Sequence, residues 1–97
     1  MVKYAVRWTD AASNDLQDIH DYLLTVTSQA TAKRLTLEIE ESTWLLPEHP
    51  RLYQVFPSAI EDTRHIVVHS TWRVLYVVDD AAHCCTVVAV VHGSRLA

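Results

Sequence analysis

The sequence predicts an α+β domain in which a helical hairpin packs on one face of an antiparallel sheet. Three observations lead to this fold class. Residues 3–8 alternate between apolar and polar side chains, as in a half-buried strand. Residues 10–46 carry apolar side chains at helical spacing. The last third of the chain then holds three β-rich segments separated by short turns. The expected order is therefore strand, helix, helix and a three-stranded antiparallel meander (β-α-α-β-β-β).

The size and composition of the chain indicate one compact domain spanning residues 1–97. Its 97 residues are 49% hydrophobic and 21% charged, with a single glycine. No apolar run reaches the roughly 18–20 residues that cross a bilayer, and the first residues lack the apolar segment of a signal peptide. We therefore expect a cytoplasmic protein.

The first strand and the first helix follow from the side-chain pattern. One face of the strand at residues 3–8 carries three apolar side chains, Tyr4, Val6 and Trp8. Thr9 and Asp10 then offer side-chain oxygens that can cap a helix. We expect this helix to end near Thr25. Its buried stripe consists of Ala12, Leu16, Ile19, Leu23 and Val26.

A second helix is expected after Thr27 and Ser28, which can cap its first turn. Its stripe alternates in steps of three and four residues through Ala32, Leu35, Ile39, Ser42 and Leu46. Three further apolar residues are expected to widen this stripe, namely Leu37, Trp44 and Leu45. Pro47 and Pro50 should end the helix, because proline has no amide hydrogen and disfavours helix in the residue before it.

The second half of the chain reads as a loop followed by strands. Residues 47–62 contain three prolines and show no period, which indicates a loop. The expected strands are Arg64–His69, Trp72–Val78 and His83–Val91. The run TVVAVV at residues 86–91 places valines on both faces of its strand. Since the helices cover one face, the other needs a cover or is a shallow binding surface, which points to a partner.

The short turn at Ser70 and Thr71 decides which side chains share a face. With two residues in the turn, Val68 lies opposite Arg73, and Arg64 then shares the face of Arg73 that points away from the helices. These two arginines would lie about 13 Å apart and could hold a phosphate or a partner carboxylate. The alternative is that both arginines lie over the sheet and pair with nearby acidic residues, namely Glu61, Asp62 or Asp80.

The charge of the chain limits the classes of partner. The net charge is −4 and the pI is about 5.8, which does not favour a protein that grips nucleic acid through phosphates. Acidic residues dominate between Asp10 and Glu48, whereas from Arg51 onward basic and acidic residues balance. An anion-binding surface is therefore expected in the second half of the chain.

No metal or cofactor site is predicted. His65 and His69 are four residues apart on a strand, about 13 Å, which is too far to share one ion. Cys84 and Cys85 are adjacent and read as two small buried apolar residues. His92 could act as an acid or base beside Arg73, although most histidines at strand ends are merely hydrogen-bonded. Common hydrolase, nucleotide-binding and protease motifs are absent.

The chain resembles the RelE/ParE superfamily of bacterial type II toxins. The resemblance rests on the element order and on four segments: TDAASNDLQDIHDYL at 9–23, LLPEHPRLY at 45–53, RHIVVHSTWRVLY at 64–76 and VVAVVHGSR at 87–95. The phrase EHPRLY, followed by Arg64, Val68-His69 and RVLY, is more similar to the ParE branch than to RelE.

The resemblance implies a toxin of a plasmid-stabilisation system that inhibits DNA gyrase by protein–protein contact, without a cofactor. It also implies a ParD-like antitoxin that wraps the toxin and suppresses it. The residues expected to contact partners are Tyr4, Val6, Arg64, Arg73, Leu75, His92 and Arg95.

Two alternatives remain open at this point. A RelE-like, ribosome-dependent mRNA endonuclease would use Arg64, Arg73 and His92 for phosphate stabilisation and proton transfer. The other basic residues of that branch are missing, and the chain ends Arg95-Leu96-Ala97 without a tyrosine. The third possibility is a degenerate, non-toxic member that only binds its antitoxin.

Overall fold

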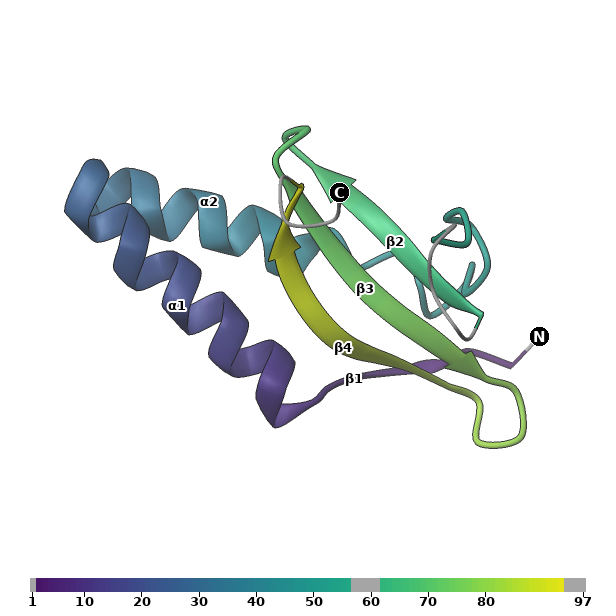
Figure 1. Cartoon of the computed structure of the whole chain (residues 1–97). Coiled ribbons are helices and arrows are strands. Elements are labelled where there is room, and N and C mark those ends of the chain that lie inside the picture. The colour runs from purple at the N-terminus through teal and green to yellow at the C-terminus, as the bar shows by residue number, and fades with distance from the viewer. Residues whose placement is uncertain (1, 57–61, 94–97) are drawn as a thin grey trace.

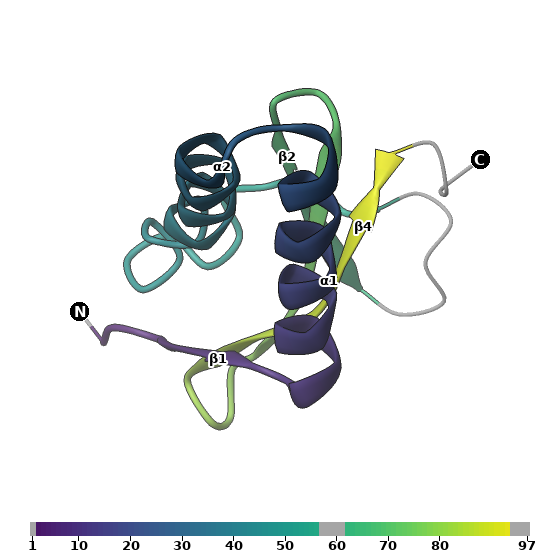
Figure 2. The ribbon, with the colours of Figure 1, turned by 90° about the vertical axis from the view of Figure 1, so that its left-hand side faces the viewer.

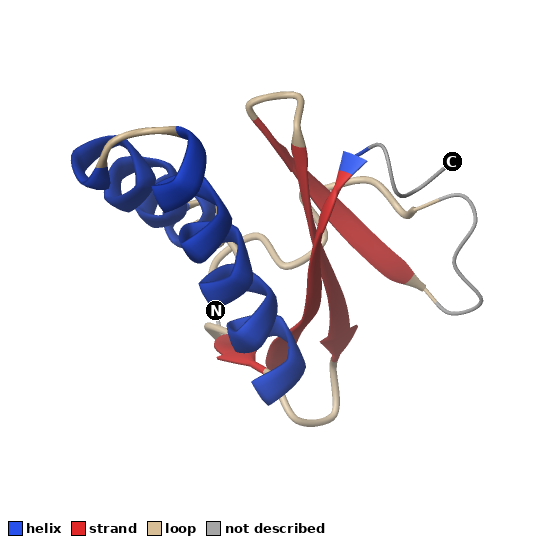
Figure 3. Cartoon of the chain, turned by 60° about the vertical axis from the view of Figure 1, so that its left-hand side comes forward, coloured by secondary structure: helices blue, strands red, loops and turns tan. Residues whose placement is uncertain are grey.

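The computed structural model describes residues 2–56 and 62–93, and its elements follow the expected order (Figure 1). They are β1 (Ala5–Trp8), α1 (Asp10–Val26), α2 (Gln29–Glu41), β2 (Thr63–Val68), β3 (Trp72–Asp79) and β4 (Cys84–His92). The four strands form one sheet in the order β1–β4–β3–β2. The β1–β4 pair is parallel, and the other two pairs are antiparallel. Both helices lie on one side of this sheet, so the predicted α+β fold is confirmed (Figure 3).

The first helix is positioned by its cap and by three buried residues. The Thr9 hydroxyl accepts a hydrogen bond from the Ala12 amide at 3.0 Å, as the sequence predicted. The helix ends at Val26, and the Thr27 amide donates to the Leu23 carbonyl. Its buried side chains are Ala12, Ile19 and Leu23. Seen from the helix side, α1 runs in front of β4, and α2 lies beside α1 (Figure 2).

The second helix ends at Glu41, five residues earlier than its apolar stripe suggested. Ser42 donates its hydroxyl proton to the Ile39 carbonyl and Thr43 donates to Glu40, so local hydroxyl bonds compete with helix continuation. The following turns bury Leu46 completely. The residues expected to widen the stripe are instead exposed, with relative exposures of 47% for Leu37, 69% for Trp44 and 54% for Leu45. That part of the sequence prediction was wrong.

The β2–β3 hairpin has a three-residue turn, and this shifts the predicted register by one. Val68 pairs with Trp72 and Val67 with Arg73, because His69 and Ser70 adopt positive φ values of 54° and 56°. A one-residue slip moves every side chain of a strand to the other face. Arg64 and Arg73 therefore lie on opposite faces, which corrects the expectation that they share one.

The core lies between the helices and the inner face of the sheet. Its largest fully buried side chains are Tyr76, Ile39, Leu46, Val74, Val87 and Cys85. The Tyr76 hydroxyl donates to the Pro50 carbonyl at 2.8 Å. This bond ties the loop after α2 to β3. Burial raises the pKa of Tyr76 to about 12. Both cysteines are buried and free, as expected.

One ion-pair network joins three distant segments at the β1 end of the sheet. Arg51 donates two hydrogen bonds to the Asp80 carboxylate, at 2.9 and 2.7 Å. The Tyr4 hydroxyl donates to the same carboxylate at 2.6 Å. Asp80 therefore pairs with Arg51, and not with either of the two arginines considered from the sequence. Hydrogen bonds from Arg51, and then from Tyr4, lower the pKa of Asp80 from 3.8 to about 2.

This network predicts a pH-dependent contribution to stability. Because the pKa of Asp80 is lower in the folded state, its stabilising effect is present above about pH 4 and is lost as the pH falls towards 2. We expect Asp80→Asn to lower the urea midpoint at pH 7, and its difference from the unmodified protein to shrink between pH 4 and pH 2. A difference that stays constant over this range would contradict the network.

Candidate functional site

The sheet surface that faces away from the helices is the first candidate for a partner site (Figure 3). We call this surface the open face and define it by nine of the described side chains that strand pairing and alternation place there. They are Arg7, His65, Val67, Arg73, Leu75, Val77, Thr86, Ala89 and Val91. Most are only half-buried, and Val67 is 50% exposed. The open face is thus largely apolar and accessible over the described chain.

Arg73 lies within this apolar surface. It pairs with Val67 on one side and Val91 on the other. Its guanidinium extends toward Gly93, where an added methyl group would lie 3.5 Å from Nη1. Arg73 forms no ion pair with the residues that the structure describes. A cation on an apolar surface without a carboxylate partner is suited to receive one from another protein.

The charges of the molecule are divided between its two sides. Helices α1 and α2 carry seven acidic residues and only two basic ones, Lys33 and Arg34. The open face carries Arg7 and Arg73. Asp79 ends β3 next to this surface, but its carboxylate accepts a hydrogen bond from the Ala82 amide within the turn. The open face therefore matches an acidic, apolar segment, and the helix side does not.

Arg64 has a structural role in the described chain. Its side chain points to the helix side and is only 15% exposed. Nη1 donates to the Tyr53 carbonyl at 2.8 Å, and Nη2 lies 3.9 Å from Asp62. Val55 also forms a β-bridge to Arg64, so this residue ties the loop after α2 to the sheet. The alternative considered from the sequence, pairing with a nearby acidic residue, is what the structure shows for Arg64.

His92 lies on the helix side of the sheet, away from Arg73. It pairs with Trp72, and the two rings meet edge to face with centroids 5.1 Å apart. Arg64 pairs with Tyr76, so four residues of β3, about 13 Å, separate the positions of Arg64 and His92. The structure therefore does not bring Arg64, Arg73 and His92 into one catalytic site.

The remaining candidate residues occupy separate places. Tyr4 belongs to the Asp80 network, and Leu75 lies half-buried on the open face. Val6 lines a groove of about 690 Å³ between β1, α1 and the turn after α2. Arg95 lies outside the described residues.

Sequence reasoning missed two exposed side chains that the structure places at these surfaces. Trp44 is 69% exposed and lines the groove beside Val6. Arg7 lies on the open face. Its position between Val6 and Trp8 in the alternating strand pattern could have predicted that it faces away from the helices. Within residues 2–56 and 62–93, no cluster of three or more potential metal ligands occurs.

A family model described as the ParE toxin of the type II toxin–antitoxin system parDE matches residues 6–97. The chain belongs to the ParE toxin family. The resemblance inferred from the sequence is thereby confirmed, and the ParE fold explains the order of helices and strands described above. No curated protein matches the sequence significantly. None of the helices in the described part of this ParE-family chain is long and apolar enough to cross a membrane.

Three solved structures are similar to this ParE-family chain. The first is a chromosomal ParDE system from P. aeruginosa, with a TM-score of 0.80 and 16% identity, covering 93% of this chain and 96% of that one. The second is the toxin–antitoxin complex RelBE2 of Mycobacterium tuberculosis, with a TM-score of 0.67 and 24% identity. The match covers 95% of this chain and 93% of that one. The third is the E. coli RelBE toxin–antitoxin complex, with a TM-score of 0.57 and 19% identity. The match covers 90% of this chain and 93% of that one. At these identities the likeness shows a shared fold.

The contrasting environments of the two arginines give a stability prediction. Arg64→Ala leaves the Tyr53 carbonyl without its charged donor, so it should lower the free energy of unfolding by about 1.5–3 kcal/mol. Arg73→Ala removes a side chain that has no ion pair, and its effect should stay within about 0.5 kcal/mol. Urea unfolding of both variants checks this. An equal decrease in the free energy of unfolding of the two variants would contradict the structural role of Arg64.

Proposed function

We propose that this chain is the toxin of a type II toxin–antitoxin pair that inhibits DNA gyrase by protein–protein contact. Membership of the ParE family supports the toxin role. The single observation that carries the mode of action is the open face, an accessible apolar surface with Arg73 near the end where β3 begins. This surface suits contact with another protein, because both cross-strand neighbours of Arg73 are valines, and His65, which lies on the same face, pairs with Leu75 two residues further along β3.

A ParD-like antitoxin is the proposed second partner, and we place both contacts on the open face. All three similar structures come from toxin–antitoxin systems, which supports an antitoxin partner. An acidic, apolar antitoxin segment would pair with Arg73 and cover Val67 and Leu75. An antitoxin bound there would block gyrase directly. The proposal places the protein in the cytoplasm, where gyrase acts.

An mRNA endonuclease is the competing function, and the geometry argues against it. The three residues that the RelE-like reading requires do not meet: Arg73 faces one side of the sheet, while Arg64 and His92 face the other. Arg64 is also engaged with Tyr53 and Asp62. The net charge of −4 gives little attraction to RNA phosphates.

The test compares gyrase and ribosome assays with matched variants. Purified protein should block supercoiling by gyrase, or trap cleaved DNA, and should leave ribosome-bound mRNA intact. Arg73→Ala should weaken the gyrase effect at least about tenfold, a loss on the scale of an interface hot spot. Arg34→Ala, an exposed arginine on α2, should have no effect, and circular dichroism should show both variants folded.

Three results would refute this proposal. Cleavage of ribosome-bound mRNA without any effect on gyrase would support the endonuclease. Full gyrase inhibition by Arg73→Ala would remove the open face from the mechanism. Inactivity of the unmodified protein in both assays would instead support a non-toxic antitoxin-binding module.

A further inference from the structure

In the part of the chain that the structure describes, no strand pairs with the outer edge of β4 over its last residues. β1 pairs with β4 only as far as Val87, whereas β4 continues to His92. The Gly93 amide bonds to the Thr71 carbonyl at 2.6 Å, which fixes the alternation of the β3–β4 ladder. Val90 therefore directs its amide and its carbonyl away from β3, toward α1. In the described chain, this stretch of β4 is a sheet edge beside a helix.

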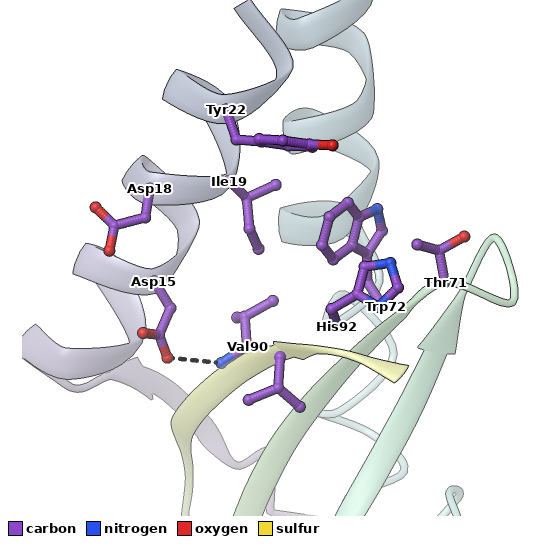
Figure 4. A pocket seen from close by; sticks show the side chains of 9 residues that line it. Asp15, Asp18, Ile19, Tyr22, Thr71, Trp72, Val90 and His92 are labelled. Atoms are coloured by element: carbon purple, nitrogen blue, oxygen red, sulfur yellow. Dashed lines mark hydrogen bonds between the residues drawn. The ribbon is translucent and has the colours of Figure 1, made fainter. Parts of the chain in front are cut away.

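An aspartate on α1 occupies the position that a neighbouring strand would take. The Asp15 carboxylate accepts a hydrogen bond from the Val90 amide at 3.0 Å (Figure 4). In a sheet, a backbone carbonyl would accept this bond. Asp15 thus satisfies this part-buried amide with a side chain, which another backbone can displace.

A groove of about 550 Å³ adjoins this edge (Figure 4). Its lining comes from one side of α1 and from the ends of β3 and β4: Asp15, Asp18, Ile19, Tyr22, Thr71, Trp72, Val90, Val91 and His92. Trp72 and Ile19 give it an apolar floor, and Tyr22 is 58% exposed at its rim. The volume is in the range of small-ligand sites, which suits a few residues of extended chain.

The charge of the groove indicates which side chain an occupant carries. Two carboxylates, Asp15 and Asp18, line it, and no lysine or arginine lines it among residues 2–56 and 62–93. Asp18 is exposed and makes none of the ion pairs found in the described residues. A guanidinium or ammonium group beside Asp18 would also meet the ring of Tyr22. This polarity is opposite to that of the open face.

We propose that this groove binds an extended, cationic segment of a partner protein, which adds as a strand to the outer edge of β4. The backbone of the segment takes over the Val90 amide from Asp15. The released Asp15 carboxylate and Asp18 then pair with a lysine or arginine of the segment. Apolar side chains of the segment lie on Trp72 and Ile19. This site is separate from the open face and does not depend on gyrase as the target.

A pair of blocked peptides tests this proposal on the full chain. The probes are acetyl-Thr-Val-Arg-Val-Thr-amide and the same peptide with glutamate in place of arginine. Titration into 15N-labelled protein should shift the amide resonances of Val90 and its neighbours with the arginine peptide, with a dissociation constant of about 1 mM or below. The glutamate peptide should bind at least about fivefold more weakly, because it meets two carboxylates.

Two variants of α1, one at the groove and one outside it, form a matched test and control. Asp18→Asn should weaken binding of the arginine peptide about two- to fivefold, as for loss of an exposed ion pair. Asp21→Asn removes the same charge from an exposed residue of the same helix outside the groove, and it should leave binding unchanged. The peptide-free spectra show whether each variant remains folded.

The results that overturn the proposal are specific. Absence of shifts at Val90 with the arginine peptide at several millimolar excludes strand addition at this edge. Equal affinity of the two peptides, or an equal loss in both variants, shows that Asp18 does not select the segment. Shifts confined to Val67 and Leu75 place the peptide on the open face and refute the groove as its site.

Discussion

The register of the β2–β3 hairpin decides which side chains of β2 enter the core and which face a partner. It is set by a three-residue turn in which His69 and Ser70 adopt left-handed backbone angles, a conformation that costs roughly 1–2 kcal/mol for residues other than glycine. Local bonds hold the turn: the Thr71 amide donates to Val68, and its hydroxyl donates to His69. His69 also contacts Glu38 on α2, and this hydrogen bond lowers the pKa of Glu38. With this register, Ile66 and Val68 of β2 enter the core beside Val74 and Trp72. Val67 faces outward.

Gly93 connects this turn to the open face. A methyl group there would lie 3.2 Å from the Thr71 carbonyl and would crowd the closing pair of β3 and β4. The guanidinium of Arg73 lies beside the same position, where an added methyl group would be in ordinary van der Waals contact with it. The end of the sheet is thus shaped by the only glycine of the chain. The open face presents cations to a partner, while the helices and the β4 groove present carboxylates. The molecule therefore offers different surfaces to acidic and to basic segments.

The sequence predicted those features that depend on residues close together along the chain. The caps at Thr9 and Ser28 and the three late strands were read from local patterns, and the structure has them. The turn at His69 was misread because it contains no glycine, asparagine or aspartate, the residues that most strongly signal left-handed angles in turns. A single residue in that turn was enough to misplace Arg64. The contact of Arg51 with Asp80, 29 residues away, has no local signal. Likewise, the end of α2 depends on hydroxyl bonds that compete with a continuing apolar pattern.

The three-residue turn exposes the Val67 side of β2, and we propose that this side belongs to the partner surface. Thiol labelling of Val67→Cys and Val68→Cys, with and without the cognate antitoxin, tests it most directly, because both native cysteines are buried. We expect rapid labelling of Val67→Cys in the free protein, strong protection in the complex, and slow labelling of Val68→Cys in both. Faster labelling of Val68→Cys in the free protein would mean a two-residue turn. Labelling of Val67→Cys that the antitoxin leaves unchanged would contradict the role of the open face.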